Sequence, residues 1–198
     1  MKKLLVLLSA LGTMFLLSTC AFAPKEAVPD YLGMLLDAAV TGNREAGLQA
    51  AQARNEYLDA VHSQEPRVDF DELMLLSRLI EAEVGETRFS DQVRLWVGEI
   101  ALNRVASPEF PDTLEEVVFQ PGQFRSASQP EFRDGLLPRR ASVRAALCLL
   151  LGQRQLAPQV LYQANYRLGP VYTQFYDSSE NQVLYFCESV NRSLYEGA

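Results

Sequence analysis

The spacing of the apolar residues changes near Pro158, and this change constrains the fold more than any other feature of the sequence. Before Pro158, apolar residues recur every three or four positions in several segments, which is typical of helices packed on a core. After it come three runs rich in β-branched and aromatic residues, VLYQANY, VYTQFY and VLYFCE, and a hairpin-sized turn, DSSENQ, separates the last two. Helices followed by a small antiparallel sheet near the C-terminus predict an α+β fold.

Two long helices are predicted in the first half of the main domain. The first begins at Asp69, which can cap it, and runs to about Val84. The second covers DQVRLWVGEIALNRVA and is capped by Ser90 or Asp91. This second helix carries apolar residues on two faces, so we expect it to lie at the centre of the domain.

The segment between this helix and the sheet is predicted to be less regular. A short helix begins at Thr113, and Gln120-Pro121-Gly122-Gln123 forms a turn. Residues 125–138 are polar and are expected to form a loop. A third core helix, SVRAALCLLLG, is expected to run from Ser142 at its cap to Gly152 just past its end.

The first 23 residues have the features of an export signal. Lys2 and Lys3 precede an apolar stretch of secretory-signal length, and small residues follow it. Residues 21–23, AFA, resemble a signal-peptidase site, whereas LSTC, which ends at Cys20, loosely resembles a lipoprotein box. We predict an exported protein that is extracellular or associated with the cell wall, with a lipoprotein as the alternative.

Residues 24–66 predict a helical hairpin that precedes the main domain, residues 67–198. The first helix, within DYLGMLLDAAVTG, stops at Gly42, and the second, NREAGLQAAQARNEYLDAVHS, is less apolar. We interpret the hairpin as a spacer or a cap on the main domain. The only histidine, His62, lies at the polar end of the second helix and is interpreted as a bystander rather than a base or a ligand.

Charge and cysteine content exclude several classes of function. Removal of the first 23 residues takes away two lysines and leaves 16 basic against 25 acidic residues, a net charge of −9. A chain this acidic is not expected to bind nucleic acid, and it would contact a membrane only through a lipid on Cys20. No set of His, Cys, Asp and Glu has metal-ligand spacing, so no cofactor is expected. Cys148 and Cys187 could form a disulfide or remain two buried thiols.

A glutamate lies on the buried face of the first long helix. Glu83 follows Leu76 by seven residues and Ile80 by three, so it shares their face, and Gly85 marks the end of the helix. An apolar neighbourhood and the negative end of the helix dipole would both favour the neutral acid, which is the form that a general acid requires. The alternative is a frayed last turn in which Glu83 reaches solvent.

Two other glutamates, Glu86 and Glu99, are candidates for a second acid. Glu86 lies past the glycine and is either a polar group of a cleft or an ordinary loop residue. Glu99 falls on the Leu95 side of the second long helix and is either a second buried acid or half of a salt bridge at the core edge. Glu81 points to another face and is expected to be a solvated charge.

Three motifs together resemble a known family. AEVG (82–85), LNRV (102–105) and the segment FPDTLEEVVFQPGQF (110–124) resemble the cell wall hydrolase family of the SleB type, typified by a spore cortex-lytic enzyme. The resemblance covers roughly residues 70–188. The family's AEARGE is shortened here to AEVGE, and its closing Gly-x-His motif is absent, so the chain looks like a divergent, clostridial-like member for which a spore role does not carry over.

The resemblance implies a lysozyme-like helical domain that cleaves peptidoglycan between N-acetylmuramic acid and N-acetylglucosamine. The family's catalytic glutamate falls on Glu83. One glutamate suffices for a lytic transglycosylase, whereas a hydrolase that uses water usually needs a second carboxylate about 5 to 9.5 Å away. The alternative is a catalytically degenerate protein of the same fold that binds peptidoglycan or serves as a scaffold. We expect a monomer whose partner is the glycan strand.

Side chains of the turn and of the strands are candidates for binding the glycan. Amides could bond the acetamido or hydroxyl groups of sugars, and aromatic rings could face sugar rings. The candidates are Gln120, Gln123, Phe124, Tyr162, Asn165 and Tyr172. The alternatives are a tight turn that Pro121 and Gly122 require and strand aromatics that belong to the core. Asn103 and Arg104 are interpreted as structural.

Overall fold

The computed structural model describes residues 28–86, 88–133 and 135–195. The predicted signal segment and Cys20 lie outside the described residues. None of the helices within the described ranges combines the length and the apolar character that a bilayer-spanning segment needs.

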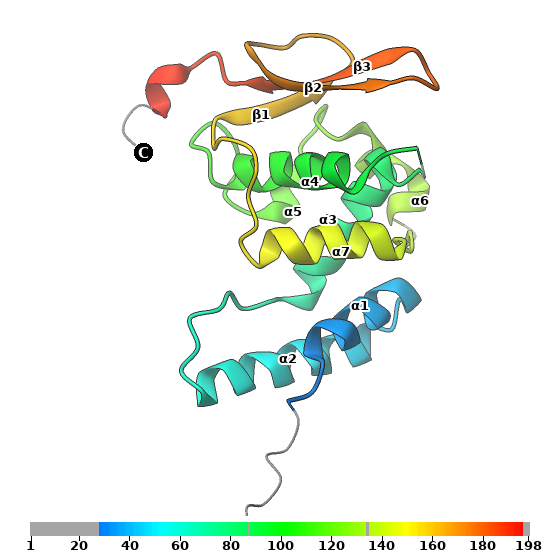
Figure 1. The fold of residues 1–198 in the computed structure, drawn as a ribbon, viewed down its shortest axis with the longest axis vertical. Helices are drawn as coiled ribbons and strands as arrows, with labels where there is room; N and C mark the ends of the chain where they lie inside the picture. The colour runs from blue at the N-terminus through cyan, green and yellow to red at the C-terminus, as the bar shows by residue number, and fades with distance from the viewer. Residues whose placement is uncertain (1–27, 87, 134, 196–198) are drawn as a thin grey trace, which may run out of the picture.

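The described chain forms seven α-helices followed by a three-stranded sheet (Figure 1). The helices are α1 (Tyr31–Thr41), α2 (Arg44–Ala60), α3 (Phe70–Val84), α4 (Asp91–Val105), α5 (Leu114–Phe119), α6 (Pro130–Arg133) and α7 (Arg140–Leu150). Two short 3-10 helices, η1 (Arg125–Ser128) and η2 (Arg192–Leu194), and the strands β1 (Val160–Ala164), β2 (Val171–Asp177) and β3 (Gln182–Glu188) complete the fold. The α+β prediction is therefore confirmed, with the sheet near the C-terminus.

The sheet is antiparallel throughout, with the strand order β1-β3-β2. One face packs on the helices: Trp96 of α4 meets Phe186 of β3 edge-on at 5.1 Å, and Phe89 lies 5.9 Å from Phe175 of β2. Figure 1 shows α4 directly beneath the sheet. The sheet therefore covers one side of the helical core and leaves its other face free of the described helices.

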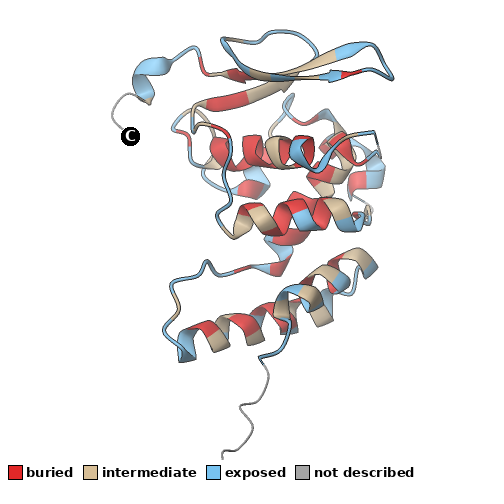
Figure 2. Ribbon diagram, in the orientation of Figure 1, coloured by how far each residue is buried: buried red, intermediate tan, exposed pale blue. Residues whose placement is uncertain are grey.

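Helix α4 is central, as its two apolar faces predict. It packs on α3, α5, α7 and β1, and Val93, Val97 and Ile100 are fully buried. Figure 2 shows burial concentrated on this helix and on α7. Near its end, Asn103 Nδ2 donates to the carbonyl oxygens of Ala157 (3.0 Å) and Val160 (3.1 Å). Asn103 thus fastens the start of β1 to the core, which agrees with a structural role.

Two expectations about the second half of the helical region were wrong. Residues 125–138 are not a plain loop, because they hold η1 and α6, and Phe132 is buried edge-on against Phe119 at 5.9 Å. Ser142 is not the cap of α7, which begins at Arg140. Ser142 is instead buried within the first turn, where its hydroxyl donates to Glu81 Oε2 at 2.6 Å.

The same contact corrects the expectation for Glu81. Its side chain is nearly buried rather than solvated, and it pairs with Arg139 at 2.6 Å. Burial alone would raise the pKa of Glu81, but the hydrogen bonds from Ser142 and Arg139 outweigh it and hold that pKa below its usual value. Glu81 therefore ties the end of α3 to the start of α7.

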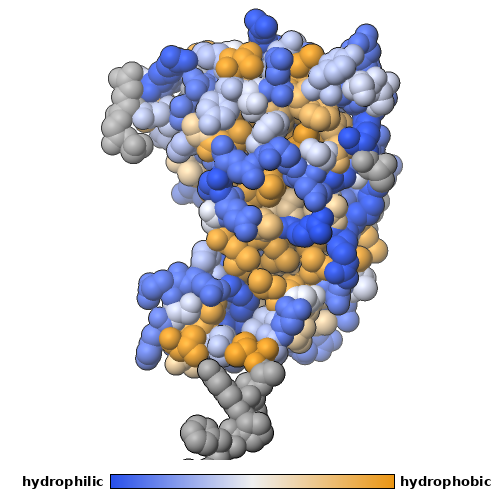
Figure 3. Space-filling model, in the orientation of Figure 1, coloured by the Kyte–Doolittle hydropathy of each residue, from blue (hydrophilic) through white to orange (hydrophobic). Residues whose placement is uncertain are grey.

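The N-terminal hairpin of α1 and α2 packs on the main domain. Leu35 and Ala39 of α1 are fully buried and join the common core, and α1 contacts α7. Gly47 of α2 lies against the ring of Phe70, so closely that a Cβ at this position would overlap the ring. Figure 3 shows an apolar band at the height of α7. The division into an appendage and a domain stays a prediction.

Both cysteines within the described residues are free thiols. Cys148 of α7 is half-buried and Cys187 of β3 is buried. The structure thus agrees with two thiols rather than a disulfide.

Candidate active site

Glu83 lies one residue before the end of α3, as the apolar stripe predicts. The helix ends at Val84, and the N–H of Gly85 donates to the carbonyl of Glu81 at 2.9 Å. Gly85 has an ordinary right-handed conformation, but a Cβ there would collide with the carbonyl oxygen of Glu81. The glycine is therefore needed for the close approach that turns the chain just after Glu83.

Two side chains from distant segments hold the carboxylate of Glu83. The Ser126 hydroxyl of η1 donates to Oε1 at 2.5 Å, and the Gln163 amide of β1 donates to Oε2 at 3.1 Å. Each oxygen thus has one donor, and the half-buried carboxylate has a fixed orientation. Both donors are neutral, and both can also bond a ligand.

Glu83 faces a cavity of about 130 Å³ between the end of α3 and the sheet. Carboxylates, amides and apolar side chains all contribute to the wall. The lining residues are Glu83, Val84, Arg88, Phe89, Gln163, Asn165, Asp177, Glu180, Gln182, Val183 and Leu184. The cavity is therefore built from the end of α3, the segment after it, the three strands and the β2–β3 turn.

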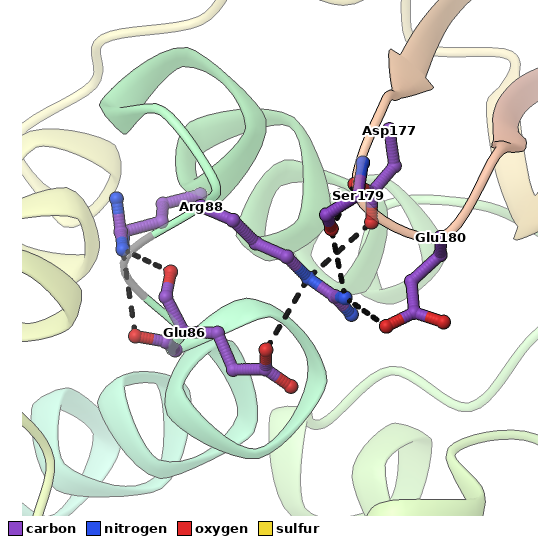
Figure 4. Close-up of polar contacts among 7 residues, drawn as sticks. Glu86, Arg88, Asp177, Ser179 and Glu180 are labelled. Carbon is purple, nitrogen blue, oxygen red and sulfur yellow. Dashed lines mark hydrogen bonds and ion pairs between the residues drawn. The ribbon is translucent and has the colours of Figure 1, made fainter.

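An arginine joins the two sides of this cavity (Figure 4). Arg88 Nη1 donates to Glu180 Oε1 at 2.7 Å and to Ser179 Oγ at 3.2 Å. Its Nε lies 3.3 Å from both Asp177 Oδ2 and Glu86 Oε2. We call these five residues the Arg88 clasp. The clasp fixes the segment after α3 to the β2–β3 turn and so holds the cavity in shape.

Asp177 is the most buried carboxylate of the clasp. Hydrogen bonds from the hydroxyl and the backbone N–H of Ser179, together with the charge of Arg88, hold the pKa of Asp177 below its usual value, against the opposing effect of burial. Asp177 is therefore ionised at neutral pH and compensated by the arginine.

A buried cation lies behind the carboxylate of Glu83. Arg104 is only 5% exposed, and its guanidinium lies over the rings of Phe124 (4.7 Å), Phe110 (4.9 Å) and Tyr162 (5.9 Å). Burial lowers the pKa of Arg104 to about 10, and the charge of Glu83 is among the influences that oppose this shift. Arg104 thus places a positive charge within electrostatic reach of Glu83 and stacks the aromatic side chains of three segments.

Comparison with known proteins identifies the family. The model of the Cell Wall Hydrolase family matches residues 90–189, slightly more than half of the chain. The chain belongs to this family. No curated protein and no solved structure matches the chain. Membership of this family indicates that the protein is a hydrolase that acts on the peptidoglycan of the cell wall.

The matched region of the hydrolase contains most of the site. It begins in the residue that caps α4 and ends just after β3, so it includes Arg104, Ser126, Gln163 and Asp177. Glu83 lies seven residues before it. The family match therefore covers the residues that surround the carboxylate of Glu83 but not Glu83 itself.

The structure places the predicted binding residues in different surroundings. Asn165 lines the cavity of Glu83. Tyr162 and Phe124 stack on Arg104, and Phe124 is only 4% exposed, which leaves almost no ring surface for a sugar. Tyr172 is exposed on the sheet and does not line the cavity.

The two amides of the turn, Gln120 and Gln123, also lie outside the lining of this cavity. Gln120 is half-buried, and its Oε1 is buried without a hydrogen-bond partner among the described residues. Gln123 is exposed, and its backbone N–H closes the predicted turn on the Gln120 carbonyl at 3.2 Å. The geometry of the turn therefore agrees with its interpretation as a structural element.

The two candidate second acids, Glu99 and Glu86, also lie in different surroundings, and neither lines the cavity of Glu83. Glu99 is fully buried, both of its oxygens accept from the backbone N–H of Gln155 at 2.9 Å, and it does not line the cavity. Glu86 is exposed and pairs with Arg88. The structure instead brings Asp177 and Glu180 to the cavity, and the sequence pattern did not single out either residue.

Ser126 and Gln163 were also missed by the sequence analysis. Ser126 follows the QPGQF segment by two residues within a stretch that had been interpreted as a loop. Gln163 is a polar residue in an otherwise apolar strand, VLYQA, and this contrast was the available signal.

Another cavity lies away from the proposed site. A larger cavity of about 570 Å³ lies at the opposite end of α3 and shares no lining residue with the cavity of Glu83. Within the described ranges, no group of three or more His, Cys, Asp and Glu could hold a metal ion.

Proposed function

We propose that this hydrolase cleaves the glycan strand of peptidoglycan as a lytic transglycosylase, with Glu83 as general acid and base. The observation that supports the proposal best is the carboxylate of Glu83, oriented by Ser126 and Gln163 at the wall of a cavity. An oriented carboxyl group at the wall of a cavity supports its assignment as the general acid and base.

The reaction needs two proton transfers at the same carboxyl group. Protonated Glu83 gives its proton to the glycosidic oxygen as the bond to the anomeric carbon of N-acetylmuramic acid breaks. The 6-hydroxyl of that sugar then attacks the anomeric carbon and returns its proton to Glu83. The products are a new non-reducing end and a 1,6-anhydro sugar, and no water is consumed.

The other carboxylates of the cavity favour this route. Asp177 and Glu180 both pair with Arg88, so neither is a free base beside the cleft. A muramidase that uses water would need such a base at about 5 to 9.5 Å from the acid.

The second candidate function is a degenerate protein that binds peptidoglycan without cleaving it. The family match begins after Glu83, so it does not cover the proposed acid. Under either function we propose that residues 1–23 export the protein and that it acts as a monomer on the wall.

Mass spectrometry of digested peptidoglycan tests the proposal. We expect the purified protein to release anhydro-muropeptides and Glu83→Gln to release none, because an amide cannot give or take the proton. Glu56→Gln, an exposed glutamate of α2, is the matched control and should behave as the parent. Products with hydrated reducing ends would show that the protein is a muramidase rather than a transglycosylase. A parent protein that binds sacculi without releasing fragments would establish the degenerate alternative.

A further inference from the structure

The outer face of the sheet carries exposed tyrosines that the proposed cleavage does not use. From Thr173 on, exposure alternates along β2: Gln174 and Tyr176 are exposed, while Thr173 and Phe175 are partly buried. Val171 and Tyr172 are both exposed at the start of the strand, where the pairing with β3 shifts register. Tyr172 is 45% exposed and Tyr176 is 57% exposed. Exposed aromatic side chains that lie together on one face can form a binding surface for another molecule.

The register of the sheet extends this face onto β3. Gln174 is paired with Tyr185 and Tyr176 with Val183, and paired residues of antiparallel strands point to the same side. The guanidinium of Arg167 lies 5.5 Å from the centre of the Tyr185 ring. The face thus carries three tyrosines, one amide and one arginine, and we call it the tyrosine face.

Contacts restrain two of the three rings of the tyrosine face, those of Tyr176 and Tyr185. The hydroxyl of Tyr176 donates to Asn181 Oδ1 at 2.8 Å, within the β2–β3 turn that the Arg88 clasp secures. The guanidinium of Arg167 packs on the ring of Tyr185. A ligand that stacks on these rings would therefore lose little conformational entropy of the protein on binding.

The size of the face limits what can cover it. Three strands at about 4.8 Å spacing and of seven residues at most give an area of roughly 300 Å². A stable protein partner usually buries about 800 Å² on each side. The face is therefore too small for a second copy of the chain or another protein, and it fits a narrow linear ligand.

The chemistry of the face matches a sugar chain. The C–H groups of a sugar ring carry partial positive charge and stack on the negative face of an aromatic ring. The hydroxyl and acetamido groups at the edge of the sugar need polar partners, and Gln174 and Arg167 lie among the rings to supply them. A membrane surface would instead require a cluster of basic residues.

We propose that the tyrosine face is a second binding surface for the glycan strand, separate from the cleavage site. The substrate class rests on the proposed function. The opposite side of the same strands lines the cavity of Glu83, through Asp177, Gln182 and Leu184. A strand of the wall bound to the tyrosine face is thereby kept next to the cleft while another segment is cleaved.

A comparison of insoluble and short soluble substrates tests this inference. The variant is Tyr176→Ala with Tyr185→Ala, made in the full chain and in the Glu83→Gln background for binding. We expect its binding to purified sacculi to weaken about tenfold or more, since each ring contributes a stacking contact. Cleavage of a soluble tetrasaccharide-peptide fragment is expected to be unchanged, because such a fragment does not reach around the sheet.

Matched variants separate stacking from folding. Tyr176→Phe with Tyr185→Phe keeps the rings and should keep at least most of the binding, whereas Met34→Ala removes an exposed apolar side chain of α1 and should change nothing. Thermal unfolding confirms that each variant is folded.

The outcomes distinguish this inference from the proposed function. Unchanged binding of sacculi by the Ala variant overturns the tyrosine face and leaves the cleavage proposal intact. An equal loss on sacculi and on the soluble fragment also overturns it, because the rings would then act within the cleavage site. Binding of sacculi through the tyrosines by a parent that releases no fragments would support the face and reject cleavage. The parent could also prove to be a dimer and the Ala variant a monomer that still binds sacculi. That result would make the face an interface between two copies of the chain and would overturn the inference.

Discussion

Glu83 and Glu99 are glutamates on neighbouring helices, and each lies where the sequence predicts an apolar environment. Glu99, in the middle of α4, is fully buried, and both of its oxygens accept from the backbone N–H of Gln155. Glu83, at the end of α3, is half-buried and faces a cavity, with Ser126 and Gln163 as its donors. The two regions use the same side chain with different partners and different access to solvent.

The difference shows which features make a buried acid suitable for chemistry. A backbone N–H holds Glu99 as part of the fold, and its side chain is fully buried and does not line the cavity of Glu83. The donors of Glu83 are side chains that can reorient, and one side of the carboxylate is open. Burial alone therefore does not mark a catalytic acid; access from a cavity and exchangeable partners are also needed.

The strongest test of this comparison substitutes each glutamate in turn. One variant is expected to lose activity and the other to lose stability. Glu83→Gln should lose cleavage at least about 100-fold with unchanged thermal stability, because a general acid commonly contributes that much to the rate. Glu99→Ala should lower the free energy of unfolding by about 2 to 4 kcal/mol, because it leaves a buried N–H unpaired and opens a void. Urea unfolding and the specific activity per folded molecule give the two quantities.

The control is the activity of Glu99→Ala once it is corrected for the folded fraction. It should equal that of the parent. A folded Glu99→Ala protein without activity would show that the two acids work together, and the distinction between them would fail.

The position of Glu83 could be predicted from the sequence because it depends on local periodicity. The same holds for the caps Asp69 and Thr113 and for the β2–β3 hairpin, all of which depend on residues close in the chain. Apolar spacing identified α4 as the centre of the core for the same reason. These features required no knowledge of which segments meet.

The partners of Glu83 could not be predicted, because they come from segments far away in the sequence. Ser126 is 43 residues from Glu83, and Gln163 is 80 residues away. Glu99 was considered as a second acid because its helix face is apolar, but the chain at Gln155 folds over it and removes it from any cleft. Only the tertiary arrangement decides which polar groups share a cavity.

A smaller effect is expected from the two donors of Glu83. Ser126→Ala or Gln163→Ala should each lower kcat by about tenfold with little change in KM, because each removes one hydrogen bond of about 1 to 1.5 kcal/mol that orients the carboxylate. Steady-state kinetics on soluble fragments provides the measurement. Ser128→Ala, an exposed serine at the end of the same 3-10 helix, is the matched control. If Ser126→Ala behaves as Ser128→Ala does, the hydroxyl does not position Glu83.

The smallest expected effect concerns the pH dependence of stability, and it tests the Glu99 side of the comparison. Burial raises the pKa of Glu99 above its usual value, and the N–H groups of Gln155 and Leu156 oppose this shift without cancelling it. Above the unfolded value of about 4.3, the native state therefore binds this proton more tightly than the unfolded state does. The contribution of Glu99 to stability is complete below that pH and is lost as the pH rises through the raised native pKa.

Measurement of the parent alone would not isolate this contribution. The pKa of Glu81 is lowered by its hydrogen bonds, which outweigh burial, so its contribution to stability grows as the pH rises and opposes that of Glu99. Both proteins contain Glu81, so the difference between Glu99→Gln and the parent removes it. Urea unfolding at a series of pH values should show the variant gaining stability relative to the parent as the pH rises above about 4.3. A difference that does not change with pH would mean that Glu99 titrates alike in the folded and unfolded chains, and that its burial has no electrostatic cost.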